Sequence, residues 1–240
     1  PKLVTSYPAI NGYFPYNKTE IPLNLFLNEP TNCRWSYADK EYGEMENEFD
    51  CKNGLIEVTN TGWNCNTTIK DENNRTYYVR CADQPWKTIN RNANAKSYVF
   101  SLGISPTELQ IASISPSGLV ISGQEPVTVE LKAATIGGAE SGKSLCSYSF
   151  GNDYYSFYST GSNNHLQIFD NIYEGIYNIK ARCIDAAGNR AESETEFGIS
   201  IDKSSPAVSR VYNKQGNLYV ITEENADKIA VASTIDSEAD

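Results

Sequence analysis

The sequence contains a single histidine, His165, and none of its cysteines stands in a Cys-x-x-Cys motif. A zinc site made of histidine and cysteine therefore has too few ligands at a suitable spacing. No Gly-x-Ser-x-Gly motif is present either, and His165 stands in a polar stretch that we interpret as a loop, so nothing indicates a Ser-His-Asp triad. We expect no metal, no cofactor and no catalytic activity.

Basic residues are in the minority, and long apolar runs are missing. The formal charge is −10, from 20 Lys and Arg against 30 Asp and Glu, and no segment concentrates the basic residues, which argues against a nucleic-acid partner. No apolar run of roughly 18 residues, the length needed to span a bilayer, occurs. The chain begins at Pro1 with neither a methionine nor a signal peptide, so we expect a processed chain or a fragment.

Apolar residues at every second position are abundant. Ile21, Leu23, Leu25 and Leu27 show this period, which predicts a strand with one apolar face. Tyrosine, which favours strands, occurs 16 times, and no segment has apolar residues at helical spacing over three turns. We therefore predict an all-β protein. Further segments predicted as strands are Cys33–Tyr37, Tyr77–Cys81, Ser97–Phe100, Pro126–Lys132, Cys146–Phe150, Tyr177–Asp185 and Glu196–Ile199.

These segments recur about every 100 residues, which indicates a repeat. The motif Cys33-x-Trp35-x-Tyr37 corresponds to Cys146-x-Tyr148-x-Phe150, and Cys81-Ala-Asp83 corresponds to Cys183-Ile-Asp185. A third copy begins after Asp202, where Asn217–Thr222 matches the strand that contains Leu23. In that copy the positions of a cysteine and two aromatic residues are taken by Lys228, Ala230 and Ala232. The repeat predicts units at residues 1–104, 105–204 and 205–240, the last one incomplete.

The repeat selects one pairing among the fifteen that are possible for six cysteines. Cys33–Cys81 and Cys146–Cys183 occupy equivalent positions, and we expect each bond to link one sheet to the other across the core, with Trp35 beside the first. Cys51–Cys65 remains as a local clip. Disulfides fit an oxidising compartment. Asn-x-Ser/Thr sequons strengthen the prediction of a secreted or cell-surface glycoprotein, and they lie at Asn17, Asn66 and Asn74.

Acidic and aromatic residues are the candidates for binding. Asp83 and Asp185 could ligate calcium at module joints, but we expect each to accept hydrogen bonds from the amides of a turn. The aromatic candidates follow Gly151-Asn152-Asp153 or are tryptophans less constrained than Trp35; strand alternation predicts that part of this set is buried. A surface able to stack on sugars or to contact a protein would consist of Trp63, Trp86, Tyr154, Tyr155 and Tyr158.

Several of these motifs match a known family. The second unit contains Gly175-x-Tyr177, Cys183-x-Asp185-x-Ala187-Gly188-Asn189 and Asp202-x-x-x-Pro206, and the first contains Asn32-Cys33-Arg34-Trp35-Ser36 and Cys81-x-Asp83-Gln84-Pro85. These motifs resemble the tandem Ig-like repeats of large bacterial and archaeal surface proteins, and the first unit looks most like the archaeal versions. The resemblance implies tandem immunoglobulin-like β-sandwiches in a secreted stalk, adhesin or filament subunit. The third copy departs from the pattern because it lacks the cysteine.

The incomplete third unit has two explanations. Either the chain is cut short, or a strand from another subunit completes the unit by β-strand addition, with the extended segment Pro1–Ile10 as the candidate donor. We expect a non-catalytic, structural or adhesive extracellular protein that associates with itself in a filament or with neighbouring domains of a longer array. The alternatives are a carbohydrate-binding module that recognises cell-surface glycans and an accessory fragment of a hydrolase.

Overall fold

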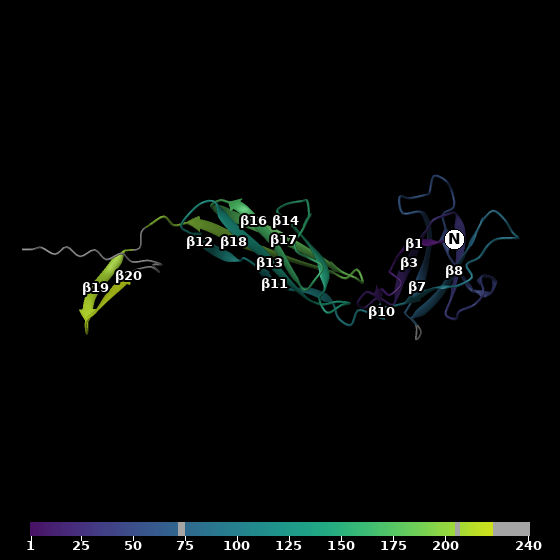
Figure 1. Cartoon of the computed structure of the whole chain (residues 1–240), viewed down its shortest axis with the longest axis horizontal. Coiled ribbons are helices and arrows are strands. Elements are labelled where there is room, and N and C mark those ends of the chain that lie inside the picture. Colours follow the sequence, from purple (N-terminus) through teal and green to yellow (C-terminus); the bar gives the residue numbers. More distant parts are fainter. Residues whose placement is uncertain (72–74, 205–206, 223–240) are drawn as a thin grey trace, which may run out of the picture.

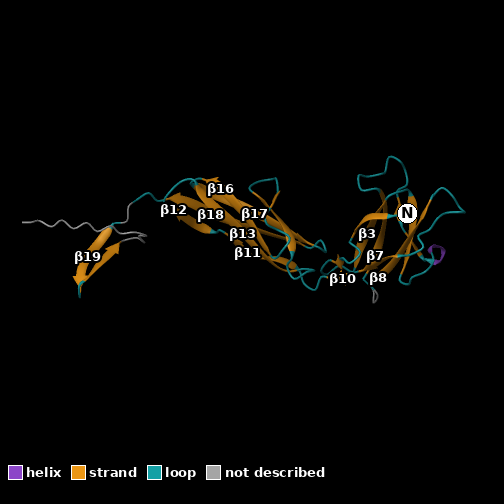
Figure 2. Cartoon of the chain, viewed as in Figure 1, coloured by secondary structure: helices purple, strands orange, loops and turns teal. Residues whose placement is uncertain are grey.

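The computed structural model describes residues 1–71, 75–204 and 207–222. Regular structure in these residues is almost entirely β-strand, with one short 3-10 helix, η1 (Tyr42–Glu44) (Figure 2). Two domains and a hairpin follow one another along the chain (Figure 1). No helix among the described residues is long and apolar enough to cross a membrane.

Two four-stranded sheets form the first domain. Their strand orders are β1-β3-β7-β6 and β5-β4-β8-β9, with antiparallel neighbours throughout. A short parallel pair, β2 with β10, lies where the chain leaves this domain. The strands are β1 (Leu3–Tyr7), β2 (Tyr13–Phe14), β3 (Glu20–Leu27), β4 (Thr31–Ser36), β5 (Asn47–Glu48), β6 (Asp50–Cys51), β7 (Trp63–Lys70), β8 (Thr76–Asp83), β9 (Tyr98–Ser101) and β10 (Gly103–Ile104).

The core of the first domain lies between these two sheets. Leu23, Leu25 and Leu27 on β3 are fully buried, as their spacing predicts, because alternate side chains of a strand share one face. From the other sheet, Trp35 packs edge-to-face on Tyr77 with the ring centroids 5.7 Å apart. The prediction that Trp35 belongs to the core is confirmed.

The second domain is also built from two sheets that enclose a core of their own. Their orders are β11-β13-β16 and β12-β18-β17-β14-β15, in which only the β12–β18 pair of the described strands is parallel. Both domains are therefore immunoglobulin-like β-sandwiches, and the protein is all-β. The strands are β11 (Leu109–Ser115), β12 (Gly118–Ser122), β13 (Val127–Gly137), β14 (Ser144–Ser149), β15 (Tyr155–Ser156), β16 (Asn164–Ile172), β17 (Gly175–Asp185) and β18 (Arg190–Ile201).

A two-stranded hairpin follows the second domain. It consists of β19 (Val208–Lys214) and β20 (Asn217–Thr222), so the segment expected to repeat the Leu23 strand is a strand. The remaining positions on which the third repeat was defined, Glu223–Asp227, Lys228, Ala230 and Ala232, lie outside the described residues.

The disulfides join the expected cysteines but not the expected sheets. Cys33 and Cys81 lie directly opposite each other on β4 and β8, with their Cα atoms 4.0 Å apart. Cys146 and Cys183 have the same relationship on β14 and β17. The prediction that these bonds connect the two sheets is wrong, because each closes a pair of neighbouring strands within one sheet. Cys51 and Cys65 form the short clip, between β6 and β7.

Candidate functional site

The two sandwiches meet at the turn between β17 and β18. Asn189 in this turn accepts a hydrogen bond from the backbone N–H of Tyr16, with 2.8 Å between the N and Oδ1 atoms. Its amide nitrogen donates to the hydroxyl of Ser105, at 2.6 Å, in the linker between the domains. The hydroxyl of Tyr7 lies 3.5 Å from the carbonyl oxygen of Ala187. We call these contacts the joint.

Asp185, the last residue of β17, organises the turn that forms the joint. Its carboxylate accepts hydrogen bonds from the backbone N–H groups of Ala187 and Asn189, each at 2.9 Å, and from that of Ala139 at 2.8 Å. The Asn189 side chain donates a fourth, at 2.8 Å. Both oxygens are thus occupied by N–H donors, which agrees with the expected turn role rather than with calcium ligation.

Gly188 allows the turn to lie against Tyr7. Its φ is +85°, a backbone conformation that residues other than glycine rarely adopt. A Cβ atom at this position would lie only 2.6 Å from the hydroxyl oxygen of Tyr7. Glycine at position 188 is therefore favoured both by the backbone conformation and by the close approach of the first domain.

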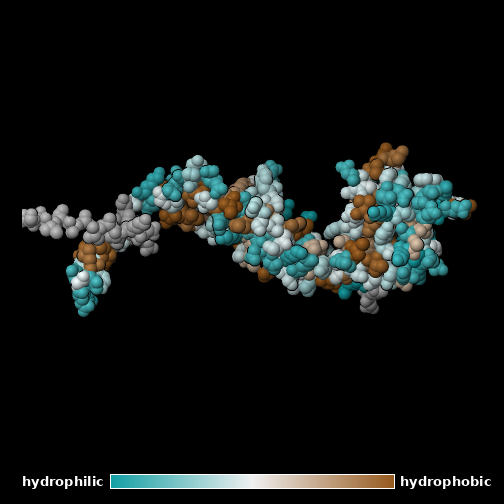
Figure 3. Space-filling view, in the orientation of Figure 1, coloured by the Kyte–Doolittle hydropathy of each residue, from teal (hydrophilic) through white to brown (hydrophobic). Residues whose placement is uncertain are grey.

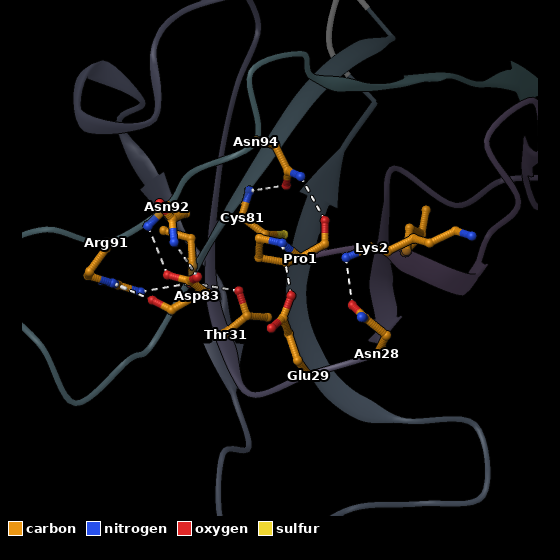
Figure 4. Close-up of polar contacts among 12 residues, drawn as sticks. Pro1, Lys2, Asn28, Glu29, Thr31, Cys81, Asp83, Arg91, Asn92 and Asn94 are labelled. Atoms are coloured by element: carbon orange, nitrogen blue, oxygen red, sulfur yellow. Dashed lines mark hydrogen bonds and ion pairs between the residues drawn. The ribbon is translucent and has the colours of Figure 1, made fainter.

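The first domain carries the same acid–amide pair at the end that lies away from the joint. Asp83 accepts hydrogen bonds from the backbone and the side-chain nitrogens of Asn92, at 2.8 and 2.9 Å (Figure 4). These bonds hold the pKa of Asp83 below its usual value, the side-chain bond having the larger effect. The backbone bond of Asp83 N–H to the carbonyl of Asn92 also has its counterpart between Asp185 and Asn189. We call each of these pairs a clasp.

The N-terminal segment, which was expected to donate a strand to another subunit, is paired within its own domain in this structure. Strand β1 pairs with β3 at the edge of the first sheet. The amine of Pro1 lies 3.1 Å from the Glu29 carboxylate, and the Pro1 carbonyl accepts a hydrogen bond from Asn94 (Figure 4). The Tyr98 hydroxyl donates a second hydrogen bond to the same carbonyl. These contacts occupy the segment that was expected to pair with another subunit.

His165 lies in a strand and not in a loop. It is part of β16, and its side chain is only 2% exposed. One ring nitrogen lies 2.9 Å from the Thr160 hydroxyl, and the other lies 3.0 Å from that of Thr135 and 3.3 Å from that of Ser144. Burial lowers the pKa of His165. The polar residues near His165 in the sequence suggested a loop. Asn163 and Asn164 among them are exposed, whereas the Thr160 hydroxyl is a partner of the buried imidazole.

The aromatic residues proposed as one binding surface are distributed over both domains. Trp63, on β7 of the first domain, is half-buried, and its indole nitrogen is shielded from solvent without a hydrogen-bond partner among the described residues. Trp86 is 71% exposed in the loop after β8. In the second domain, Tyr155 and Tyr158 are exposed, whereas Tyr154 is half-buried and lies under the Arg182 guanidinium. The structure therefore does not bring the tryptophans together with the tyrosines.

The glycosylation sites occupy different environments. Asn17 is exposed in the loop between β2 and β3, where its φ is +56°. Asn66 is half-buried on β7, between Asn24 of β3 and Asp50 of β6. Asn74 lies outside the described residues. Their glycosylation stays a prediction, and Asn17 has the more accessible side chain of the two described sites.

No family model matches the sequence, and no curated protein matches it. Among solved structures, the chain is similar to the fibronectin(III)-like modules of CbhA from Clostridium thermocellum, with 9% identity over 82% of this chain and 94% of that one and a TM-score of 0.45. It is also similar to the Ig1-2 module of the Drosophila receptor protein tyrosine phosphatase DLAR, with 10% identity, coverage of 78% and 96%, and a TM-score of 0.29. A third similar structure is that of Sidekick-1 immunoglobulin domains 1-5, with 12% identity over 84% of this chain and 39% of that one and a TM-score of 0.37. At such identities the likeness concerns the fold alone.

Proposed function

We propose that this chain is a non-catalytic, structural or adhesive part of an extracellular protein in which Ig-like sandwiches are fixed end to end. The joint is the observation that carries this proposal, because Asn189 ties its own hairpin to the first domain and to the linker by side-chain hydrogen bonds. Three disulfides support an oxidising, extracellular environment. A fixed joint is what a stalk or filament subunit needs in order to keep its binding ends apart.

We further propose that the array grows through the hairpin of β19 and β20. A two-stranded hairpin is at best marginally stable in water by itself. Val211 and Leu218 lie on the same face of the hairpin and are 55% and 51% exposed among the described residues. Figure 3 shows hydrophobic side chains at the surface of this hairpin. Strands from a second copy of the chain would pair with an open edge of the hairpin by β-strand addition. The sandwich completed in this way would pack a second sheet on this face and would produce head-to-tail assembly.

Sedimentation velocity and electron microscopy of the purified chain test this assembly. The wild type is expected to form end-to-end oligomers that grow with concentration, and the double variant Val211→Lys/Leu218→Lys is expected to stay monomeric. The matched control, Leu145→Lys/Ile176→Lys, changes apolar residues of the second domain that are somewhat more exposed, at 60% and 74%, and should assemble like the wild type. Oligomers of unchanged size in the hairpin variant would refute growth through the hairpin.

A carbohydrate-binding module is the second candidate function. Tyr155 and Tyr158 are 56% and 84% exposed and lie three positions apart in the sequence, and tyrosine rings can stack on sugars. Glycan-array binding that is lost in Tyr155→Ala/Tyr158→Ala, but kept in a variant at the distant Trp86, would favour this function over a purely structural one.

A further inference from the structure

The clasp of the first domain carries an insertion that the clasp of the second domain lacks. Residues 84–91 separate Asp83 from Asn92, whereas only residues 186–188 separate Asp185 from Asn189. In the second domain the short turn forms the joint. In the first domain the longer loop instead lines a cleft together with strands β4 and β5 of its own sheet.

The cleft has a volume of about 460 Å³ and a largely polar lining. This volume lies within the range of roughly 300–1,000 Å³ that is common for small-molecule sites. Strands β4 and β5, the 3-10 helix η1 and the inserted loop supply the polar side chains of the lining, which are Asn32, Arg34, Tyr42, Glu48, Asn90 and Arg91. Four separate segments of the chain thus converge on one concave surface.

Tyr42 brings two guanidinium groups together in this cleft. The Cζ atoms of Arg34 and Arg91 lie 5.3 and 5.7 Å from the centroid of its ring, distances at which a cation is attracted to the aromatic face. Two cations held against one ring repel each other. Glu48, which pairs with Arg34, neutralises one of the two charges. The cleft therefore keeps one positive charge in a chain whose formal charge is −10.

The remaining hydrogen bonds fix Arg91 without using all its donors. Its Nε and Nη2 atoms donate to the carbonyl oxygens of Asp83 and Ala82, at 2.8 and 2.9 Å (Figure 4). Among the described residues, Nη1 of Arg91 and Nε and Nη1 of Arg34 donate no hydrogen bond. An arginine that is held in place while part of its fork stays free is well suited to bind an anion.

We infer that this cleft binds the carboxylate of an acidic sugar, as found in glycans that contain uronic acids. The free guanidinium donors match a carboxylate, and the side-chain amides of Asn32 and Asn90 can form hydrogen bonds with sugar hydroxyl groups. The polar lining offers little for the apolar side chains of a peptide. This inference is independent of the assembly proposed above and of the tyrosines of the second domain.

Isothermal titration calorimetry with a galacturonic acid hexamer tests the site on the full chain. The wild type should bind the hexamer with an affinity that falls as sodium chloride is added, and it should not bind the fully methyl-esterified hexamer, whose carboxylates are neutral. Arg34→Gln should weaken binding by about tenfold or more, because it removes charge-assisted hydrogen bonds. Arg34→Lys should give an intermediate loss, since the charge remains and the fork is lost.

Arg182→Gln is the matched control. Arg182 also pairs with a glutamate, Glu192, and its guanidinium also lies over a tyrosine, Tyr154, but it belongs to β17 of the second domain. This variant should bind the hexamer like the wild type, and melting curves establish that all three variants are folded. The inference would be overturned if the ester bound as tightly as the acid, or if Arg34→Gln bound the hexamer as tightly as the wild type does. It would also be overturned if the protein bound inorganic phosphate or an acidic peptide but did not bind the hexamer.

Discussion

Asn189 accepts a hydrogen bond from the backbone of Tyr16, although 173 positions separate the two residues in the chain. The same amide donates to Ser105 and to Asp185. One side chain therefore connects the N-terminal segment, the linker and the turn between β17 and β18. The joint depends on few residues, so single substitutions can test it.

Asp185→Ala should destabilise the second domain. The substitution leaves three backbone N–H groups and the Asn189 amide without their acceptor. Hydrogen bonds to a charged group contribute on the order of 1.5–3 kcal/mol each and are not additive, so we expect a loss of about 3 kcal/mol in the free energy of unfolding. Denaturation by guanidinium, followed by circular dichroism, measures it. Asp83→Ala should cost less, because that carboxylate is more exposed; an equal or larger effect there would contradict the role assigned to Asp185.

The second domain should lose stability in mild acid. Burial holds the pKa of His165 below its ordinary value of 6.5, so the unfolded chain takes up a proton at a higher pH than the folded chain does. The contribution of neutral His165 to the free energy of unfolding is therefore fully present above pH 6.5. It is lost as the pH drops from there to the folded-state pKa, with a slope approaching about 1.4 kcal/mol per pH unit.

Urea denaturation between pH 7.5 and 5 measures this slope for each domain. In His165→Gln the slope of the second domain should vanish, because glutamine does not titrate. The first domain contains no histidine and provides an internal control. A second domain whose stability is constant over this range would show that the buried imidazole does not titrate in the expected direction.

Removal of a disulfide should affect the domain that contains it. Cys146 and Cys183 are separated by 37 residues, and Cys33 and Cys81 by 48. Loop entropy predicts that each of these bonds stabilises its domain by about 4 kcal/mol, and the Cys51–Cys65 clip contributes about 3 kcal/mol more to the first domain. Cys146→Ala/Cys183→Ala should thus lower only the unfolding transition of the second domain.

Full reduction extends this experiment to both domains. Because the first domain has two of the three bonds, it should lose more stability than the second when a reductant is added. Near-ultraviolet dichroism during guanidinium unfolding, with and without reductant, follows the two transitions. An intact signal throughout the chain after complete reduction would disagree with this account.

Local patterns in the sequence predicted the strands, and the repeat predicted the cysteine pairs. The period of two places Leu23, Leu25 and Leu27 in the core because a strand with one buried face needs that spacing. The sheet positions of Cys33 and Cys81 were not predictable, since a bond between neighbouring strands and a bond across the core both leave two buried cysteines at the same spacing.

Contacts between segments that are distant in the chain could not be predicted from the sequence. His165 resembled a loop residue because its partners, Thr135 and Ser144, come from other strands. The same holds for the cleft, where Arg34 and Arg91 meet at Tyr42 only after β4, η1 and the inserted loop have folded together. The Asp185 turn is the partial exception, because the Asp-Ala-Ala-Gly-Asn sequence identified a turn, although not the domain that it contacts.

Residual dipolar couplings of the full chain test most directly whether the joint fixes the two sandwiches. If it does, backbone couplings from both domains of the wild type fit one shared alignment tensor. Asn189→Ala should need two separate tensors, whereas Asn92→Ala, the equivalent change in the other clasp, should still fit one. Two tensors for the wild type, or one shared tensor for Asn189→Ala, would contradict a joint held by this residue.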